Sequence, residues 1–474
     1  MQTFLAMEKI TSAKDQERDD REKLLPLPSV ADRNQLLRAN FGAFIILVIS
    51  FFLIPGNSYA QQDTTGLKKG GDTVKLVPDG TEGVELAIRK EDTKPKQLPP
   101  NEFEGSYSTF RIGMGFIGDF TTHIQSKEFQ QQMDSAGLDV KTTYKTRDFR
   151  ILGSGVLKTK RYISWKFAYM YDGDKEVWML RESGITIGVP ELFGHLFIGR
   201  TKEGYSILRV MNGHSGWGNE RAMAQDVIPI LADGIKWFGM LPKSRIFWNL
   251  GYYNDFISKG QSFSTFSSQF VARVGWLPIN EEKTETTLHI GANLRYAKPL
   301  DGKIELKSRP ESNPTPQLIF TGKFESDHST HVGYEIYYRR KQFMIGSEYN
   351  FHNFHADKGE SHLFQGGDVM VSYFFTKTYR PYKTVGSIFG FVPVRKSVFK
   401  GGWGEIEAVV RYSMMNLNDG SIKGGKFWRI TPMINWYLSR ALRWEFIYGY
   451  GVLDRYGLQG AVQFIETRLQ LTVM

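Results

Sequence analysis

The sequence predicts an all-β fold, a transmembrane antiparallel β-barrel with an inward-folded third loop. Two observations predict it: apolar and polar residues alternate along many short segments, and mean hydropathy is slightly polar at −0.34 although 14% of residues are aromatic. A period of two puts the apolar and polar sets on opposite faces of a strand. Because this alternation weakens the hydropathy signal, a barrel fits these values and a bundle of long apolar helices does not.

Residues 1–60 are predicted to be a leader that directs export. Its apolar core, residues 41–54, is about 14 residues long and therefore shorter than the roughly 20 of a spanning helix. A proline and a glycine follow the core, and Ser58 and Ala60 place small residues at the −3 and −1 positions of a signal-peptidase site. The alternative is an uncleaved anchor.

The charge and the cysteine content narrow the function classes. The formal net charge is +10, which favours nucleic acid, an anionic lipid surface or anionic solutes as partners. Export leaves the last two, and nucleic acid is not expected. The absence of cysteine excludes thiol catalysis, disulfides and thiolate metal sites.

Residues 61–105 are predicted to form a flexible periplasmic tail, since they are rich in Gly, Lys, Asp and Pro and show no sustained period. Residues 106–474 are predicted to form the barrel. The candidate strands are 107–118, 148–157, 161–171, 176–187, 194–202, 234–240, 244–254, 267–276, 285–297, 317–325, 330–339, 343–351, 365–376, 403–414, 425–437, 441–450 and 461–473. A barrel with both ends in the periplasm needs an even number. Either one short candidate is false, giving sixteen strands, or Lys303–Ser308 is also a strand, giving eighteen.

The connection from Lys202 to Asp233 is too apolar for a loop in water and too irregular for a strand. We expect it to fold into the lumen and narrow the pore, with Lys202, Arg209, His214 and Arg221 near the constriction. The alternative is a cap packed over the barrel mouth.

The inward register of the strands carries eleven bases and six acids. The bases are Arg111, Arg150, Lys166, Arg273, Arg295, Lys323, Arg339, Arg411, Arg429, Arg443 and Arg468. The acids are Glu335, Glu348, Glu405, Glu407, Glu445 and Glu466. Rings of Arg and Lys lower the barrier for anions, and the planar donor fork of Arg suits oxyanions. The alternative is that many of these bases pair with the acids and only keep the lumen wet.

Motifs for chemistry are weak. Ser215 lies in GHSGW, where a nucleophile elbow requires a second Gly in place of Trp217. Histidines and acids crowd the connection from His352 to His362, and we interpret them as a polar outer-loop tip rather than a metal site. The sequence predicts no enzyme, no cofactor and no metal.

Several segments are similar to one family. Residues 199–255, KSRPE at 307–311, and the signals RYSMMNLNDG, IKGGK and NWYL between 411 and 438 resemble the phosphate-selective porin O/P family. The resemblance covers the chain from about residue 104 to its end. It implies a sixteen-stranded homotrimeric porin whose third loop folds inward and whose lumen carries an arginine ladder, with lysines at the constriction. The chain ends in Val473-Met474, where such barrels end in an aromatic residue that the barrel-assembly machinery recognises.

The expected function is passive diffusion of small anions, such as inorganic phosphate or polyphosphate, through a porin of the bacterial outer membrane. Expected partners are these anions, outer-membrane lipids, the barrel-assembly machinery and two further copies of the chain. The alternatives are a general porin of low selectivity, and an outer-membrane receptor or hydrolase of barrel form.

Overall fold

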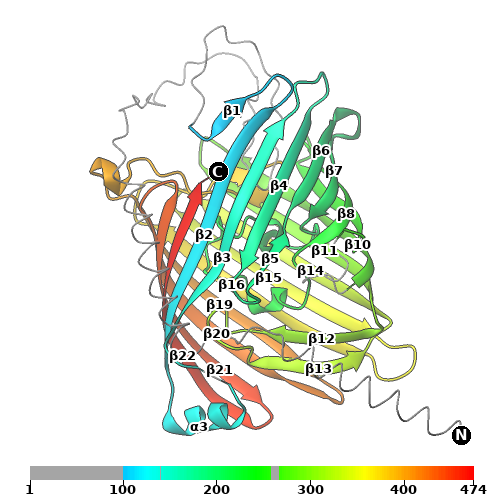
Figure 1. The fold of residues 1–474 in the computed structure, drawn as a ribbon, viewed down its shortest axis with the longest axis vertical. Helices are drawn as coiled ribbons and strands as arrows, with labels where there is room; N and C mark the ends of the chain where they lie inside the picture. Colours follow the sequence, from blue (N-terminus) through cyan, green and yellow to red (C-terminus); the bar gives the residue numbers. More distant parts are fainter. Residues whose placement is uncertain (1–99, 139, 258–265, 474) are drawn as a thin grey trace, which may run out of the picture. The chain divides into compact units, whose positions relative to one another are not determined.

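The computed structural model describes residues 100–138, 140–257 and 266–473, so the predicted leader and residues 61–99 of the predicted tail lie outside the described residues. Within them an antiparallel sheet forms the wall of the barrel (Figure 1). Its strands are β2 (Thr109–Ile124), β3 (Thr143–Val156), β4 (Ile163–Asp172), β5 (Val177–Leu180), β6 (Ser183–Val189), β7 (Gly194–Thr201), β8 (Ala232–Leu241), β9 (Ile246–Asn254), β10 (Phe266–Glu281), β11 (Thr286–Pro299), β14 (His328–Arg340), β15 (Phe343–His355), β16 (His362–Phe374), β19 (Glu405–Asp419), β20 (Ile422–Tyr437), β21 (Leu442–Arg455) and β22 (Leu458–Val473).

The wall closes on itself and has sixteen strand positions among the described residues. β5 and β6 both pair with β4 and so share one position. Each strand then pairs with the next, and β22 returns to β2 from Met114↔Val473 to Ile124↔Gln463. The predicted sixteen-stranded antiparallel barrel is therefore confirmed.

Two of the candidate strands lie outside the wall. β12 (Lys303–Ser308) and β13 (Ile319–Glu325) pair only with each other, as a separate hairpin in the connection between β11 and β14. β11 pairs directly with β14 from Thr286↔Arg340 to Ala297↔Ser329, which leaves no free edge for a further strand. The candidate at 317–325 is a strand, but its prediction as a barrel strand was wrong.

The remaining elements are short. β1 (Glu102–Glu104) falls in the predicted tail and pairs with the start of β2. α3 (Lys127–Ser135) begins at Ser126, whose hydroxyl accepts the Phe129 backbone N–H at 3.1 Å. The others are η1 (Pro190–Leu192), α4 (Ile207–Val210), η2 (Met223–Gln225), β17 (Tyr382–Lys383), β18 (Ile388–Phe389) and η3 (Val398–Lys400). No helix in the described ranges is long and apolar enough to cross a membrane.

The two faces of the wall differ as the alternation predicts. On β19 the outward Val410 and Tyr412 are exposed, whereas the inward Arg411 and Ser413 are buried. Polar side chains are buried here because connecting segments fold into the barrel. The connections at the end that carries the C-terminus are short except for residues 375–404, and α3 lies at the opposite end (Figure 1). In outer-membrane barrels the short turns face the periplasm.

Candidate functional site

The wall bases predicted from the register lie on the lumen side, with one exception. Ten of them are on the inner faces of barrel strands, and eight have side chains that are almost fully buried, from Arg150 on β3 to Arg468 on β22. Arg111 and Lys166 are partly buried. Lys323 is exposed on β13, because its segment forms the separate hairpin. It is therefore not part of the wall.

Most of the buried wall bases are ion-paired. The pairs are Arg273–Glu335 at 2.7 Å, Arg295–Glu203 at 2.6 Å, Arg443–Glu445 at 2.5 Å, Arg468–Asp119 at 2.5 Å, Arg150–Asp148 at 2.8 Å and Arg411–Glu311. Only two of these acids, Glu335 and Glu445, belong to the predicted inward set. Pairing is thus widespread, and it also uses acids outside the predicted strands, such as Glu203 and Glu311.

Of the buried wall bases in the described part of the chain, Arg429 and Arg339 have the weakest contacts with acids, and Arg429 lies 3.8 Å from Glu311. Arg429 donates from Nε to Thr431 at 2.8 Å, while its two Nη atoms make no hydrogen bond there. Arg339 donates from Nη2 to Thr287 at 2.7 Å and lies 4.5 Å from the ring centre of Tyr379. Each of these two guanidinium groups keeps two buried nitrogen atoms without a hydrogen bond in the described residues.

The third loop, residues 202–231 between β7 and β8, lies inside the barrel. Wall carboxylates hold it: Glu335 accepts the Ile207 backbone N–H at 2.7 Å, and Glu348 accepts that of Leu208 at 3.0 Å. Both N–H groups belong to α4, whose first turn has no partners of its own. Two of the predicted lumen acids therefore serve as anchors for the loop, which confirms that it folds inward.

The bases of the third loop mainly bind its own backbone. Lys202 donates to the Met211 carbonyl at 2.5 Å, Arg209 to that of Gln225 at 2.7 Å, and Arg221 to that of Leu208 at 2.8 Å. His214 contacts Thr472 at 2.6 Å. Of the three predicted constriction bases, Arg221 also borders a cavity.

A second segment enters the lumen from the opposite end. Residues 375–404 connect β16 to β19, and their innermost turn is held by Arg273, which donates to the carbonyls of Gly386 at 3.1 Å and Ser387 at 2.9 Å. The Phe389 ring lies 6.2 Å from that of Trp217 in the third loop. The two inward segments therefore meet in an apolar contact inside the barrel.

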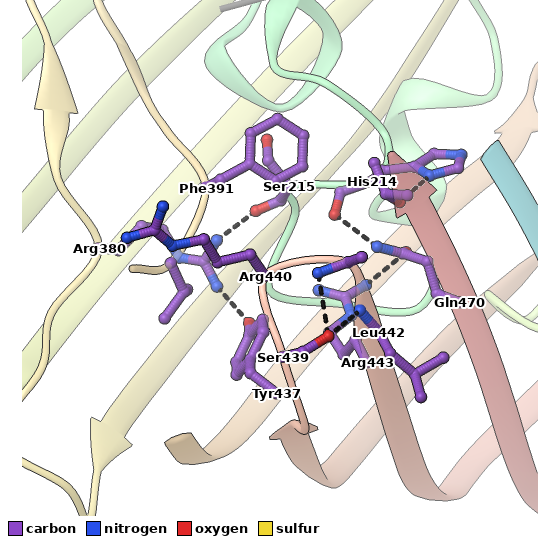
Figure 2. Close-up of a pocket in the computed structure, with 13 residues that line it drawn as sticks. His214, Ser215, Arg380, Phe391, Tyr437, Ser439, Arg440, Leu442, Arg443 and Gln470 are labelled. Atoms are coloured by element: carbon purple, nitrogen blue, oxygen red, sulfur yellow. Dashed lines mark hydrogen bonds between the residues drawn. The ribbon is translucent and has the colours of Figure 1, made fainter. Parts of the chain in front are cut away.

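Two basic cavities border the turn from Asn212 to Gly218 of the third loop. One is lined by Arg147, Arg221 and Arg411 and by the single acid Glu220. The other is lined by Arg380, Arg440 and Arg443 and by no acid (Figure 2).

Figure 2 shows how the arginines of the second cavity are held. Arg380 donates to the Tyr437 hydroxyl at 2.8 Å and to the Ser215 carbonyl. Arg443 donates to Gln470 at 3.1 Å, and Gln470 in turn donates to the His214 carbonyl at 2.8 Å. Fixed donors around a small space suit an anion with several oxygen atoms.

Three of these cavity arginines were not predicted. Arg147 was missed because β2 and β3 shift register between Ile117 and Gly118, so that a bulge on β3 breaks the alternation. Arg380 and Arg440 lie in connections rather than strands. For Arg380 a signal exists, since residues 375–404 hold six bases and no acid.

The polar outer connections hold one further charged contact. In the β4–β5 turn, Asp174 pairs with Lys145 and with Arg309 from the β11–β14 connection. Burial raises the pKa of Asp174, but these two bases outweigh it and hold the pKa below its usual value. The contact ties the turn to the connection that carries β12 and β13.

The residues considered for chemistry are separated in space. Ser215 donates its hydroxyl to the Asn212 carbonyl at 3.0 Å, so it does not face His214. His352 is buried and contacts His331 at 2.7 Å, whereas His355 lies 3.5 Å from Asp357. In the described ranges no group of three or more His, Cys, Asp or Glu side chains could hold a metal ion.

Comparisons with known proteins give a family and a fold. The family model described as phosphate-selective porin O and P matches residues 194–472. An uncharacterized protein of Caulobacter vibrioides is 27% identical over 177 residues, 36% of this chain and 35% of the relative. This chain thus matches about a third of that relative's length.

Solved structures include a loop L8 deletion mutant of OmpT, an outer membrane protein of Vibrio cholerae. It is 11% identical, and the match covers 77% of this chain and 100% of the mutant, with a TM-score of 0.51. An anion-selective porin from Comamonas acidovorans is 12% identical, with coverages of 77% and 99% and a TM-score of 0.48. The first of these shares the barrel fold.

Proposed function

This chain belongs to the phosphate-selective porin O and P family, and we propose that it conducts small anions, phosphate among them, by passive diffusion. It is a porin of the bacterial outer membrane. The selectivity for anions and the assembly as a homotrimer are proposals.

One observation carries the proposal. The two cavities beside the third-loop turn are lined by six arginines and one glutamate, so bases outnumber acids there, although Arg147, Arg380, Arg411 and Arg443 each also pair with an acid. Because the turn from Asn212 to Gly218 contributes to both cavities, a solute that passes it meets positive charge on either side. Clefts lined by one sign of charge concentrate counter-ions and raise their entry rate.

The arginines would act as transient ligands. Each guanidinium replaces part of the hydration shell of an anion with directed N–H donors, and its planar fork matches two oxygen atoms of phosphate. Several weak sites in series allow flux, whereas one tight site would block it. The ion pairs elsewhere hold the third loop and the wall in place, so that the free donors keep their positions.

The test is the reversal potential of single channels in planar bilayers under a salt gradient. We expect anion preference for the wild type, and a smaller preference for Arg440→Glu, which reverses one charge in the second cavity and leaves the ion pairs of the wall bases in place. The control is Arg340→Glu, an exposed arginine at the end of β14. Cation preference in the wild type would contradict the proposal.

The alternative is a general porin of low selectivity. The pairing of Arg273, Arg295 and Arg468 favours it, because paired charges contribute little net field to the lumen. Liposome swelling distinguishes the two functions. Equal permeation of phosphate and of neutral sugars of similar size would support the general porin.

A further inference from the structure

One part of the connection 375–404 enters the lumen, as described above. The rest of this connection lies outside the lumen. The segment holds six bases and no acid. Of these bases Arg380 is buried beside Glu407, and Arg395 lies 3.3 Å from Glu405. Lys377, Lys396 and Lys400 remain exposed. In Figure 1 this part, coloured gold, projects beyond the strands near the end where the C-terminus lies.

Aromatic side chains stand beside these lysines. Phe375, Phe399 and Trp403 are 65%, 56% and 81% exposed. Phe375 continues the outward face of β16, and its ring lies 5.7 Å from that of Tyr373. The Trp403 carbonyl accepts the indole N–H of Trp436 on β20 at 2.8 Å. Phe375 and Trp403 therefore lie at the end of the lipid-facing surface, and Phe399 is exposed in the connection between them.

The order of residues matches the depth profile of a membrane interface. Aromatic rings occupy the headgroup level, and lysines beside them place their charges just outside it. Lys377 follows Phe375 by two residues, and Lys400 directly follows Phe399 in η3. Another short turn at the same end, residues 281–285, carries three acids and one base. This part of the rim is therefore more positive than the turn at 281–285, as is the turn at 157–162, which carries three bases and no acid.

We propose that Lys377, Lys396 and Lys400, with Phe375, Phe399 and Trp403, form a binding surface for anionic phospholipids of the adjacent leaflet, such as phosphatidylglycerol. The ammonium groups contact the phosphate, and the rings contact the upper acyl chains. The charge excludes a preference for zwitterionic lipid, and the exposed rings on the lipid face require an apolar partner. This inference is independent of anion conduction.

Native mass spectrometry of the full chain in detergent tests the proposal, with phosphatidylglycerol and phosphatidylcholine added separately. The variant combines Lys377→Gln, Lys396→Gln and Lys400→Gln. Since each lysine near an anionic surface contributes to the attraction, we expect retention of phosphatidylglycerol to fall about tenfold, and that of phosphatidylcholine to stay unchanged.

The control combines Lys243→Gln, Lys283→Gln and Lys341→Gln, which removes three exposed lysines from other short turns at the same end. It should retain phosphatidylglycerol as the wild type does, and single-channel conductance should be equal in all three proteins. Excess inorganic phosphate should leave the lipid bound.

Four results would overturn the proposal: wild-type retention in the variant, an equal loss in the control, displacement of the lipid by phosphate alone, or an altered number of chains per particle. The last would assign the surface to contacts between copies.

Discussion

Glu348 on β15 is the residue on which we expect the position of the third loop to depend most. Its carboxylate accepts hydrogen bonds from the Leu208 backbone at 3.0 Å, the Gln225 side chain at 3.1 Å, the Tyr337 hydroxyl at 3.0 Å and the Ser206 hydroxyl. Three of these donors belong to the loop. At about 1 kcal/mol for each net hydrogen bond, Glu348→Ala costs the attached loop about 3 kcal/mol.

A change of about 3 kcal/mol raises the fraction of detached loop about 100-fold, since 1.4 kcal/mol is a factor of ten. Because the attached loop occupies the lumen, we expect a larger single-channel conductance and faster amide exchange across residues 202–231. Glu282→Ala, in an exposed turn, is the control. Wild-type conductance together with unchanged amide exchange in the Glu348 variant would refute the anchoring role.

Three further perturbations test other contacts. Phe389→Ala removes the ring that meets the third loop, and we expect a loss of about 3 kcal/mol in urea unfolding and a larger conductance. Gly218→Ala would place a Cβ 2.5 Å from Nη1 of Arg411, so we expect a loss of about 1–3 kcal/mol, whereas the matched Gly213→Ala has 3.7 Å of room and should be nearly neutral. The pKa of Asp174 is lowered in the folded protein, so its contact stabilises the fold above the ordinary Asp value of about 3.9 and is lost as pH falls through the folded pKa. Amide exchange of residues 173–176 should rise in acid for the wild type and not for Asp174→Asn.

The faces of the wall were predictable because alternation is a local property of each strand. Arg411 and Ser413 point inward and Tyr412 points outward, as the period of two requires. The same reasoning fails at Arg147, since a single extra residue in β3 changes the face of the side chain. The alternation of apolar and polar residues in the sequence does not reveal this bulge.

Part of the ion pairing was not predictable, because two of the partners come from distant connections. Arg295 pairs with Glu203, 92 positions earlier, and Arg411 pairs with Glu311, 100 positions earlier. Counting bases and acids on the inner face of the wall leaves out these acids. The net charge of the lumen therefore depends on how the connecting segments fold. The pattern of the strands alone does not predict that.

The strand count was open for a similar reason. β13 has the composition of a barrel strand, and only the direct pairing of β11 with β14 excludes it from the wall. Which strands pair with each other depends on the whole sheet. A segment that looks like a strand by itself can therefore lie either in the barrel wall or in a separate hairpin.

The junction of β2 and β22 has a consequence for the order of assembly. Asp119 and Arg468 are paired there although 349 positions separate them, so the last strand must be available before the first can complete its hydrogen bonds. Contacts of such long range form slowly, because the chain must first be brought together at an entropic cost. Until then β2 and β21 present open edges that other chains could occupy. Biogenesis of this protein therefore requires that one edge of the sheet be protected for as long as the rest of the chain is arriving.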